Sequence, residues 1–246
     1  MAARSVIAAT GARYRRLDVP QLEQFEGVSV HYAATEAEAQ RCEGEEVAVV
    51  GGGNSAGRAA LFLAGRTRRV YLLIRGDDLG KGMSRYLVER IMNAENVELL
   101  ANTEVGELMG EDHLEGVVVE DNSSGARRTL GAQALFVFIG ADANTGWLRG
   151  AVDLDERGFV LTGRELDGSA LDVDAWRERS REPFLLETSL PGVFAAGDVR
   201  SGSIKQCASA VGEGAMAVRL VHQYLADAGL QDALGRARGS PVNRPR

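Results

Sequence analysis

The sequence predicts an α/β fold in which buried parallel strands alternate with amphipathic helices. Three observations lead to this prediction. Continuous apolar runs at 47–50 and 70–74 are typical of strands that are buried on both faces of a parallel sheet. Apolar residues recur at helical spacing between these runs. The 30 glycines and the hydrophobic fraction of 45% suit a well-packed α/β protein with many tight turns.

The first half of the chain begins with a short buried strand that runs into a turn at Gly11, and a short helix is expected over residues 33–40. From Glu46 onward, strands and helices alternate. The expected elements of this alternation are a strand at 47–50, a helix from Ala56 to Arg66, a strand at 70–74, a helix capped by Ser84, and a strand at 97–100.

After residue 100 the apolar period changes to that of short strands. These are expected at 104–108, 114–120 and 135–139, with a turn at 121–125. The last third of the chain is expected to contain a short strand at 158–161, a charged surface loop at 162–183, a strand from 191 that ends in a Gly-Asp turn, and a helix at 208–225 with Met216, Leu220 and Val221 on its apolar face.

Composition and charge exclude several classes of function. A net charge of −7 argues against a nucleic-acid partner, which would require a basic face. No apolar run approaches the ~18 residues of a membrane span, and no signal-peptide core is present, so the cytoplasm is the expected compartment. Cys42 and Cys207 form neither a CxxC pair nor a zinc site. His31, His113 and His222 lack metal-ligand spacing, so no metal is expected.

One glycine motif predicts a nucleotide-binding site. Gly51-x-Gly53-x-x-Ala56 lies between a buried strand and an amphipathic helix. Gly51 allows a sharp turn, Gly53 leaves room for a pyrophosphate against the backbone, and Ala56 lets the helix pack closely. Free N–H groups at the helix N-terminus would face the phosphates. The candidate ligands of the loop are Gly51, Gly52, Gly53, Asn54, Ser55 and Ala56, with Asn54 and Ser55 capping the helix or bonding the phosphate.

The end of the next strand predicts which dinucleotide binds. Arg75 follows about twenty residues after the last small residue of the motif, and Lys81 is nearby. Basic groups at this place suit the 2′-phosphate of NADP, whereas an acidic group would bind the ribose hydroxyl of NAD. We therefore predict NADPH. Asp77 and Asp78 leave NADH as the alternative.

Several segments together resemble thioredoxin reductases and their flavoprotein relatives, within the pyridine nucleotide-disulfide oxidoreductases. The most specific is the Gly-Val-Phe-Ala-Ala-Gly-Asp stretch, and the order of all the segments strengthens the resemblance. The matching segments are 7–11, 51–56, 138–140 with 144–145, and 191–198.

The resemblance implies a Rossmann-like NAD(P)-binding domain inserted into an incomplete FAD-binding domain of the three-layer ββα type, and a homodimer. Residues 33–140 would form the NAD(P)-binding domain. Residues 1–32 and 141–230 would be pieces of the FAD domain, followed by a disordered tail at 231–246.

The resemblance also implies the flavin site. It places Asp198 on the sugar–ribityl part of FAD, although a turn-capping carboxylate is an alternative role for a buried aspartate there. Flavin-ring contacts are implied for Lys205, Gln206 and Cys207, although Cys207 is otherwise expected to be a small buried residue. The remaining cofactor-binding positions implied are Thr10, Gly11, Ile139, Gly140 and Gly197. The chemistry would be hydride transfer from NADPH C4 to flavin N5 toward an unknown acceptor, with no side chain as catalyst.

Two departures from the family pattern matter. Where thioredoxin reductases carry Cys-x-x-Cys, this sequence has Ala34-Thr-Glu-Ala37, so a dithiol relay is not expected. The family also opens with a strand–GxGxxG–helix unit for the ADP half of FAD, and no second glycine fingerprint is present here. A shortened reading frame, a gene fragment and a partner chain that supplies this half all remain open. The alternative function is a non-catalytic nucleotide-binding or sensing module.

Overall fold

A computed structural model describes residues 3–166, 176 and 181–227 of the chain. The predicted disordered tail at 231–246 and most of the predicted loop at 162–183 lie outside these residues.

The chain divides into two compact units. The nested unit comprises Tyr14–Gly140, and the flanking unit comprises Met1–Arg13 together with Ala141–Arg246. The nested unit therefore begins at Tyr14, whereas the resemblance implies an inserted domain that begins at residue 33. Residues 14–32 pack with the nested unit because Leu22, Phe25 and Val30 are buried in its core.

A five-stranded parallel sheet forms the centre of the nested unit, in the order β3-β10-β4-β5-β6. Its strands are β3 (Val30–His31), β4 (Glu46–Val50), β5 (Arg69–Leu73), β6 (Val97–Leu100) and β10 (Ala134–Val137). A separate antiparallel sheet contains β7 (Thr103–Gly110), β8 (Leu114–Asp121) and β9 (Arg127–Leu130). The predicted alternation, the strands after residue 100 and the closing strand are thus confirmed, while β3 was not predicted.

The helices of the nested unit are α1 (Leu22–Phe25), α2 (Glu36–Arg41), α3 (Asn54–Ala64), the 3₁₀ helix η1 (Leu79–Lys81) and α4 (Arg85–Met92). The predicted helix at 33–40 begins later, because Thr35 and Glu38 form a capping box at the start of α2.

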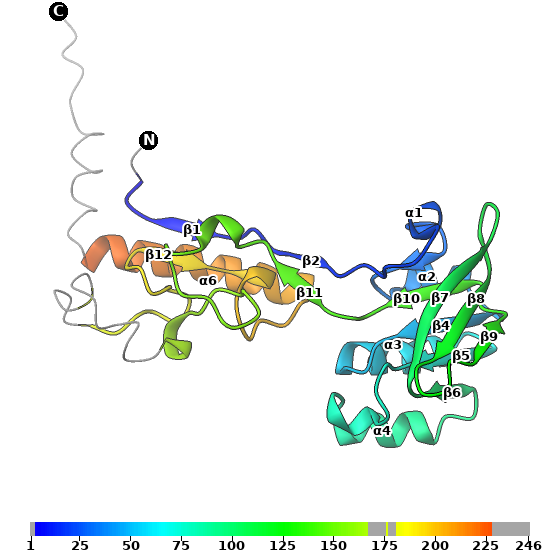
Figure 1. Ribbon diagram of the computed structural model, residues 1–246. Coiled ribbons are helices and arrows are strands. Elements are labelled where there is room, and N and C mark those ends of the chain that lie inside the picture. Colours follow the sequence, from blue (N-terminus) through cyan, green and yellow to red (C-terminus); the bar gives the residue numbers. More distant parts are fainter. Residues whose placement is uncertain (1–2, 167–175, 177–180, 228–246) are drawn as a thin grey trace, which may run out of the picture. The chain divides into compact units, whose positions relative to one another are not determined.

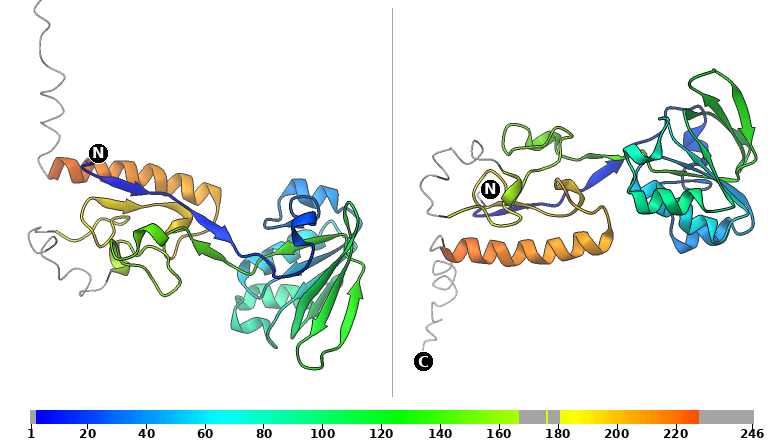
Figure 2. Two further views of the ribbon diagram at one scale, coloured as in Figure 1. Left: turned by 45° about the horizontal axis from the view of Figure 1, so that its top comes forward. Right: turned by 90° about the horizontal axis from the view of Figure 1, so that it is seen from below.

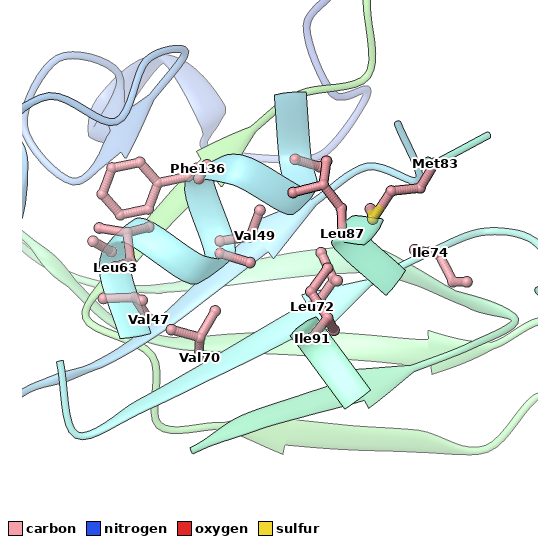
Figure 3. Packing of buried hydrophobic residues seen from close by; sticks show 14 of the residues in the cluster. Val47, Val49, Leu63, Val70, Leu72, Ile74, Met83, Leu87, Ile91 and Phe136 are labelled. Atoms are coloured by element: carbon pink, nitrogen blue, oxygen red, sulfur yellow. The ribbon is translucent and has the colours of Figure 1, made fainter. Parts of the chain in front are cut away.

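Successive side chains of the central strands point to opposite faces and build two cores. Val47 and Val49 of β4 face α3 and α4, where Leu63 and Ile91 are buried (Figure 3). Ala48 and Val50 face the β7–β8–β9 sheet instead. Figure 1 shows the resulting order of layers, with α3 and α4 on one face of the parallel sheet and the antiparallel sheet on the other.

The flanking unit is built from both ends of the chain. Its elements are β1 (Val6–Ala8), β2 (Ala12–Tyr14), β11 (Ala141–Ala143), β12 (Val193–Ala195), the 3₁₀ helices η2 (Gly146–Leu148), η3 (Gly163–Glu165) and η4 (Gly197–Val199), and the long helix α6 (Cys207–Asp227). Strand β1 pairs in parallel with β12, and β2 pairs with β11. Helix α6 (Figure 2) packs against β12 through Ala217 and Tyr224. No helix of the described part of the chain is long and apolar enough to cross a membrane.

Two predictions for this unit are wrong. No strand forms at 158–161, where Val160 makes isolated bridges to Leu154 and Arg200 instead. Of the apolar face predicted for α6, Leu220 and Val221 pack with Ala217 and Tyr224, but Met216 is 42% exposed. Trp176, the one described residue between 167 and 180, is buried.

A buried ion pair close to Trp176 also contradicts the prediction that the arginines of this segment are solvated. Arg181 donates two hydrogen bonds to Glu187, of 2.7 and 2.9 Å, and the Glu187 side chain is fully buried. The guanidinium also stacks on the rings of Trp176, Phe184 and Tyr224. This cluster fixes the segment before β12 onto α6.

Acidification is expected to weaken the nested unit through His31, which is buried against Phe136. Burial lowers the pKa of His31; the carboxylate of Glu38 opposes this change and Arg41 reinforces it. The unfolded chain then binds more protons at His31 than the folded chain below pH ~6.5, so the contribution of His31 to stability is constant above that pH and is lost as the pH falls through it. Hydrogen exchange of the β3 and β10 amides between pH 7.5 and 5 would measure the loss. A His31→Gln variant with the same acid slope would contradict the assignment.

Candidate nucleotide and flavin sites

The glycine loop leaves the central sheet at the carboxyl end of β4. Gly51 has a φ of +141°, and a Cβ there would clash with the carbonyl oxygen of Phe138. The Gly51 N–H donates to Leu73 O, and the Phe138 N–H donates to Val50 O. Only glycine therefore suits position 51, because the ends of three neighbouring strands converge there.

Gly53 differs from Gly51, because no protein atom occupies the space that a side chain at position 53 would fill. A Cβ at Gly53 would have the carbonyl oxygen of Gly82 as its nearest atom, at 3.9 Å. Gly53 is the N-cap of α3 in extended conformation, without a side-chain cap. Packing does not require glycine here, and the space over this backbone is open, as the close approach of a ligand would need. Ala56 is fully buried under the loop, as helix packing requires.

The two polar side chains of the loop behave differently. Asn54 Oδ1 accepts a hydrogen bond of 2.7 Å from the backbone N–H of Ser84. Ser55 is exposed, and its hydroxyl has no hydrogen-bond partner among the described residues. Asn54 is therefore engaged within the protein, whereas Ser55 remains available to a phosphate.

The basic residues after β5 are partly engaged. Arg75 is exposed and has no ion pair with any residue that the structure describes. Lys81 lies 2.6 Å from Asp77, and this hydrogen bond raises the pKa of Lys81 and lowers that of Asp77. Asp78 accepts the N–H of Gly80 and caps η1. Both acidic groups are thus occupied, and Arg75 is the cation that stays available.

The second candidate site lies in the flanking unit, at the carboxyl end of β12. Gly197 turns with a φ of +78° and leads into Asp198, which is half-buried rather than buried as predicted. No hydrogen bond of the Asp198 carboxylate to a described residue is present, and its charge acts on Lys205. A turn-capping role therefore has no support in these contacts.

Glu213 of α6 anchors the turn at Gly197 and Asp198 through hydrogen bonds. This residue was not predicted from the sequence. Its carboxylate accepts the Gly197 N–H at 2.7 Å and the Arg200 guanidinium at 2.8 Å. Burial would raise the pKa of Glu213, but these hydrogen bonds outweigh it and lower the pKa. The sequence could have indicated this role, because Glu213 is a charged residue on the side of the predicted helix that faces the strand.

The residues that precede α6 are only partly enclosed. Lys205 Nζ donates to Arg200 O and Ser203 Oγ and lies 4.2 Å from the centre of the Phe159 ring. Burial lowers the pKa of Lys205. Gln206 and Cys207 are exposed, so the prediction of a buried Cys207 is wrong; Cys207 begins α6 on its open side.

Thr10 and Gly11 are fixed by Asn144. Thr10 Oγ1 donates to Asn144 O, Asn144 Nδ2 donates to Thr10 O, and Asn144 N donates to Gly11 O, at 2.9 to 3.1 Å. Gly11 has a φ of +66°. In the nested unit, Ile139 packs into the core and the Gly140 carbonyl accepts the Arg15 N–H. These contacts order the strand ends next to which a cofactor would lie.

Residues 1–214 match the pyridine nucleotide-disulphide oxidoreductase family. The chain belongs to this family. Members of the family are NAD(P)H-dependent flavoprotein oxidoreductases that use FAD.

Relatives and solved structures agree with this membership. The chain is 30% identical to the 34.2 kDa protein in the rubredoxin operon of Clostridium pasteurianum and 34% identical to the F component of alkyl hydroperoxide reductase in Staphylococcus aureus. Each match covers 90% of this chain, but 65% of the first relative and 39% of the second. Thioredoxin reductases from Giardia duodenalis and Lactococcus lactis superpose with TM-scores of 0.70 and 0.69, at 29% and 26% identity. These matches cover 90% and 91% of this chain, and 66% and 67% of the two reductases. The α/β fold with parallel sheets is therefore that of thioredoxin-reductase structures over part of their length.

The two cofactors of the family fit this chain unequally. The open space at Gly53, the α3 N-terminus and Arg75 suit a dinucleotide. The half-buried Asp198 carboxylate can accept hydrogen bonds from hydroxyl groups such as those of a ribityl chain, whereas Lys205 Nζ already donates to Arg200 O and Ser203 Oγ. The Gly-x-Gly-x-x-Ala spacing recurs at 212–217, but these residues lie inside α6 and not at a turn from a strand to a helix.

Proposed function

We propose that the chain binds NADPH in its nested unit and the flavin part of FAD in its flanking unit, as an oxidoreductase that passes a hydride from the nucleotide to the flavin. The observation that carries the proposal is the glycine loop at 51–53, where the protein leaves space against bare backbone at Gly53. Family membership supports the flavin half. Bound flavin would supply the hydride acceptor, and the final electron acceptor lies outside this chain.

The residues of this chain would bind and orient rather than react. Backbone N–H groups at the start of α3 would hold the pyrophosphate, and Ser55 would add a hydroxyl donor. Arg75 would pair with the 2′-phosphate. Asp198 would accept hydrogen bonds from ribityl hydroxyls, on a turn that Glu213 holds in place.

The proposed reaction does not proceed through an internal dithiol. Ala34-Thr-Glu-Ala37 contains no thiol. Burial raises the pKa of Cys42, which keeps this thiol protonated and a poor nucleophile. Cys207 is exposed and lies in the other unit.

The alternative is a nucleotide-binding or sensing module without catalysis, or a gene fragment that does not hold FAD. The two interpretations predict different colours for the purified protein. Protein purified with added FAD should be yellow and retain visible flavin absorption after desalting, and NADPH should bleach these bands anaerobically. A colourless protein that still binds NADPH would overturn the enzyme proposal and leave the module.

Replacing Arg75 by glutamate is expected to shift preference from NADPH toward NADH. The carboxylate would repel the 2′-phosphate and accept the ribose 2′-hydroxyl of NADH. The loss of one charge-assisted pair predicts NADPH binding weaker by about 10-fold or more. Dissociation constants for both nucleotides, from quenching of their fluorescence, would measure the shift. An unchanged ratio of the two dissociation constants would contradict the prediction that the site prefers NADPH.

A further inference from the structure

The segment at 79–84 lies directly against the glycine loop and α3. A Cβ at Gly82 would come within 2.9 Å of the Gly52 carbonyl oxygen, so the two backbones are in close contact. A Cβ at Gly57 would come within 2.6 Å of Met83 Sδ, so Met83 fills the space above Gly57. Apolar packing thus brings this segment to α3. The Gly82 and Met83 N–H groups donate to Leu79 O, which leaves the Ser84 N–H at the end of the segment.

Asn54 supplies the polar link. Its Oδ1 lies 2.7 Å from the Ser84 backbone nitrogen. Because a backbone N–H only donates, the amide atom that faces it is the oxygen. Asn54 is the first residue of α3, and Ser84 is the N-cap of α4. One side chain therefore joins the starts of the two helices.

The segment that Asn54 holds carries the residues assigned to the 2′-phosphate. At one end, backbone hydrogen bonds on both sides of Arg75 fix it. Ile74 N donates to Leu100 O, Thr103 N donates to Ile74 O, and Asn102 N donates to Gly76 O. At the other end, the Asn54–Ser84 hydrogen bond fixes it. Arg75 is exposed at the first anchor, and the Lys81–Asp77 pair between the two anchors is more than half exposed. Without the second anchor, nothing polar among the described contacts ties the end of the segment to the loop.

We propose that Asn54 is a positioning residue that determines nucleotide specificity: it orients the Arg75–Lys81 segment relative to the glycine loop, and so favours NADPH over NADH. This inference rests on the proposed dinucleotide site. Asn54 acts through the part of the segment that carries Lys81, which it places relative to Arg75 and the glycine loop, and not as a pyrophosphate ligand, one of the two roles first expected for it.

The Asn54→Ala variant separates these two roles. If Asn54 positions the segment, NADPH binding should weaken about 5-fold to 10-fold, as expected for one hydrogen bond, while the dissociation constant for NADH should change less than about 2-fold. A pyrophosphate ligand would weaken both nucleotides equally, since both carry the pyrophosphate. Equal losses would therefore overturn the inference.

Ser84→Pro deletes the same hydrogen bond from its other side. Ser84 has a φ of −62°, which proline adopts, and proline has no N–H. The expected shift in the NADPH/NADH ratio matches that of Asn54→Ala, and the double variant should shift no further. Ser84→Ala keeps the N–H and should keep the ratio of the parent protein. Additive shifts in the double variant would contradict the inference.

Nucleotide binding by the unsubstituted protein separates a failure of the proposed dinucleotide site from a failure of the role proposed for Asn54. If this protein binds neither nucleotide, or binds both equally, the proposed dinucleotide specificity fails and this inference with it. If it prefers NADPH and the preference survives both substitutions, only the role of Asn54 is overturned.

Discussion

Replacing Gly53 by valine is expected to abolish NADPH binding while the fold survives. Gly53 has extended backbone angles that valine tolerates, and a Cβ would meet no protein atom closer than 3.9 Å. The added side chain would instead fill the space that the pyrophosphate needs. We expect the dissociation constant to rise about 100-fold or more, which corresponds to roughly 2.8 kcal/mol. Fluorescence titration of NADPH measures it, and circular dichroism checks the fold.

Gly65→Val is the matched control at the opposite end of the same helix. Gly65 has a φ of −72°, and a Cβ there would make an ordinary contact of 3.5 Å with Phe62 O. This variant should bind NADPH like the parent protein. If Gly53→Val bound equally well, the glycine loop would not be the pyrophosphate site.

Replacing Arg181 by methionine is expected to destabilise the flanking unit by about 3–5 kcal/mol. The change would leave the Glu187 carboxylate, which is 0% exposed, buried without its cation. Its remaining donors would be the Phe184 and Gly192 N–H groups, which do not neutralise it. Both tryptophans of the chain, Trp147 and Trp176, belong to the flanking unit, so urea unfolding followed by tryptophan fluorescence reports on this unit.

Arg157→Met controls for the loss of cation–π stacking alone. Arg157 stacks on Phe159 at 5.6 Å and is exposed, with no carboxylate paired to it among the described residues. Its replacement should change stability by less than about 0.5 kcal/mol. Adding Glu187→Gln to Arg181→Met should recover stability, since it removes the buried charge. A loss below about 1 kcal/mol in Arg181→Met would show that the pair behaves as a surface ion pair.

Local patterns predicted most of the nested unit. The clearest pattern covers β4, the glycine loop and α3. Strand burial, turn geometry and helix packing each restrict the residue types in this short stretch, so its fold could be predicted from the sequence. The antiparallel strands after residue 100 were equally clear from their alternation. In contrast, β3 has only two residues and is a strand through its pairing with β10, which lies about 100 residues away.

The roles of individual side chains in the sites depend on contacts between residues far apart in the sequence, which a local sequence pattern does not show. Asn54 looked like a phosphate ligand, because its partner Ser84 is 30 residues away and binds through its backbone. The burial of Arg181 depends on Glu187 and a ring cluster in tertiary contact. Cys207 is exposed because the side of α6 that packs is set by Ala217 and Tyr224 further along the helix. In each case, tertiary neighbours determine what the side chain does.

Isothermal titration calorimetry of the whole chain with NADPH, repeated with NADH, tests the central claim most directly. The account predicts one saturable site per chain, tighter binding of NADPH, and loss of the signal in Gly53→Val. An absence of heat and of saturation with both nucleotides would contradict the dinucleotide site and every role assigned to the residues around it.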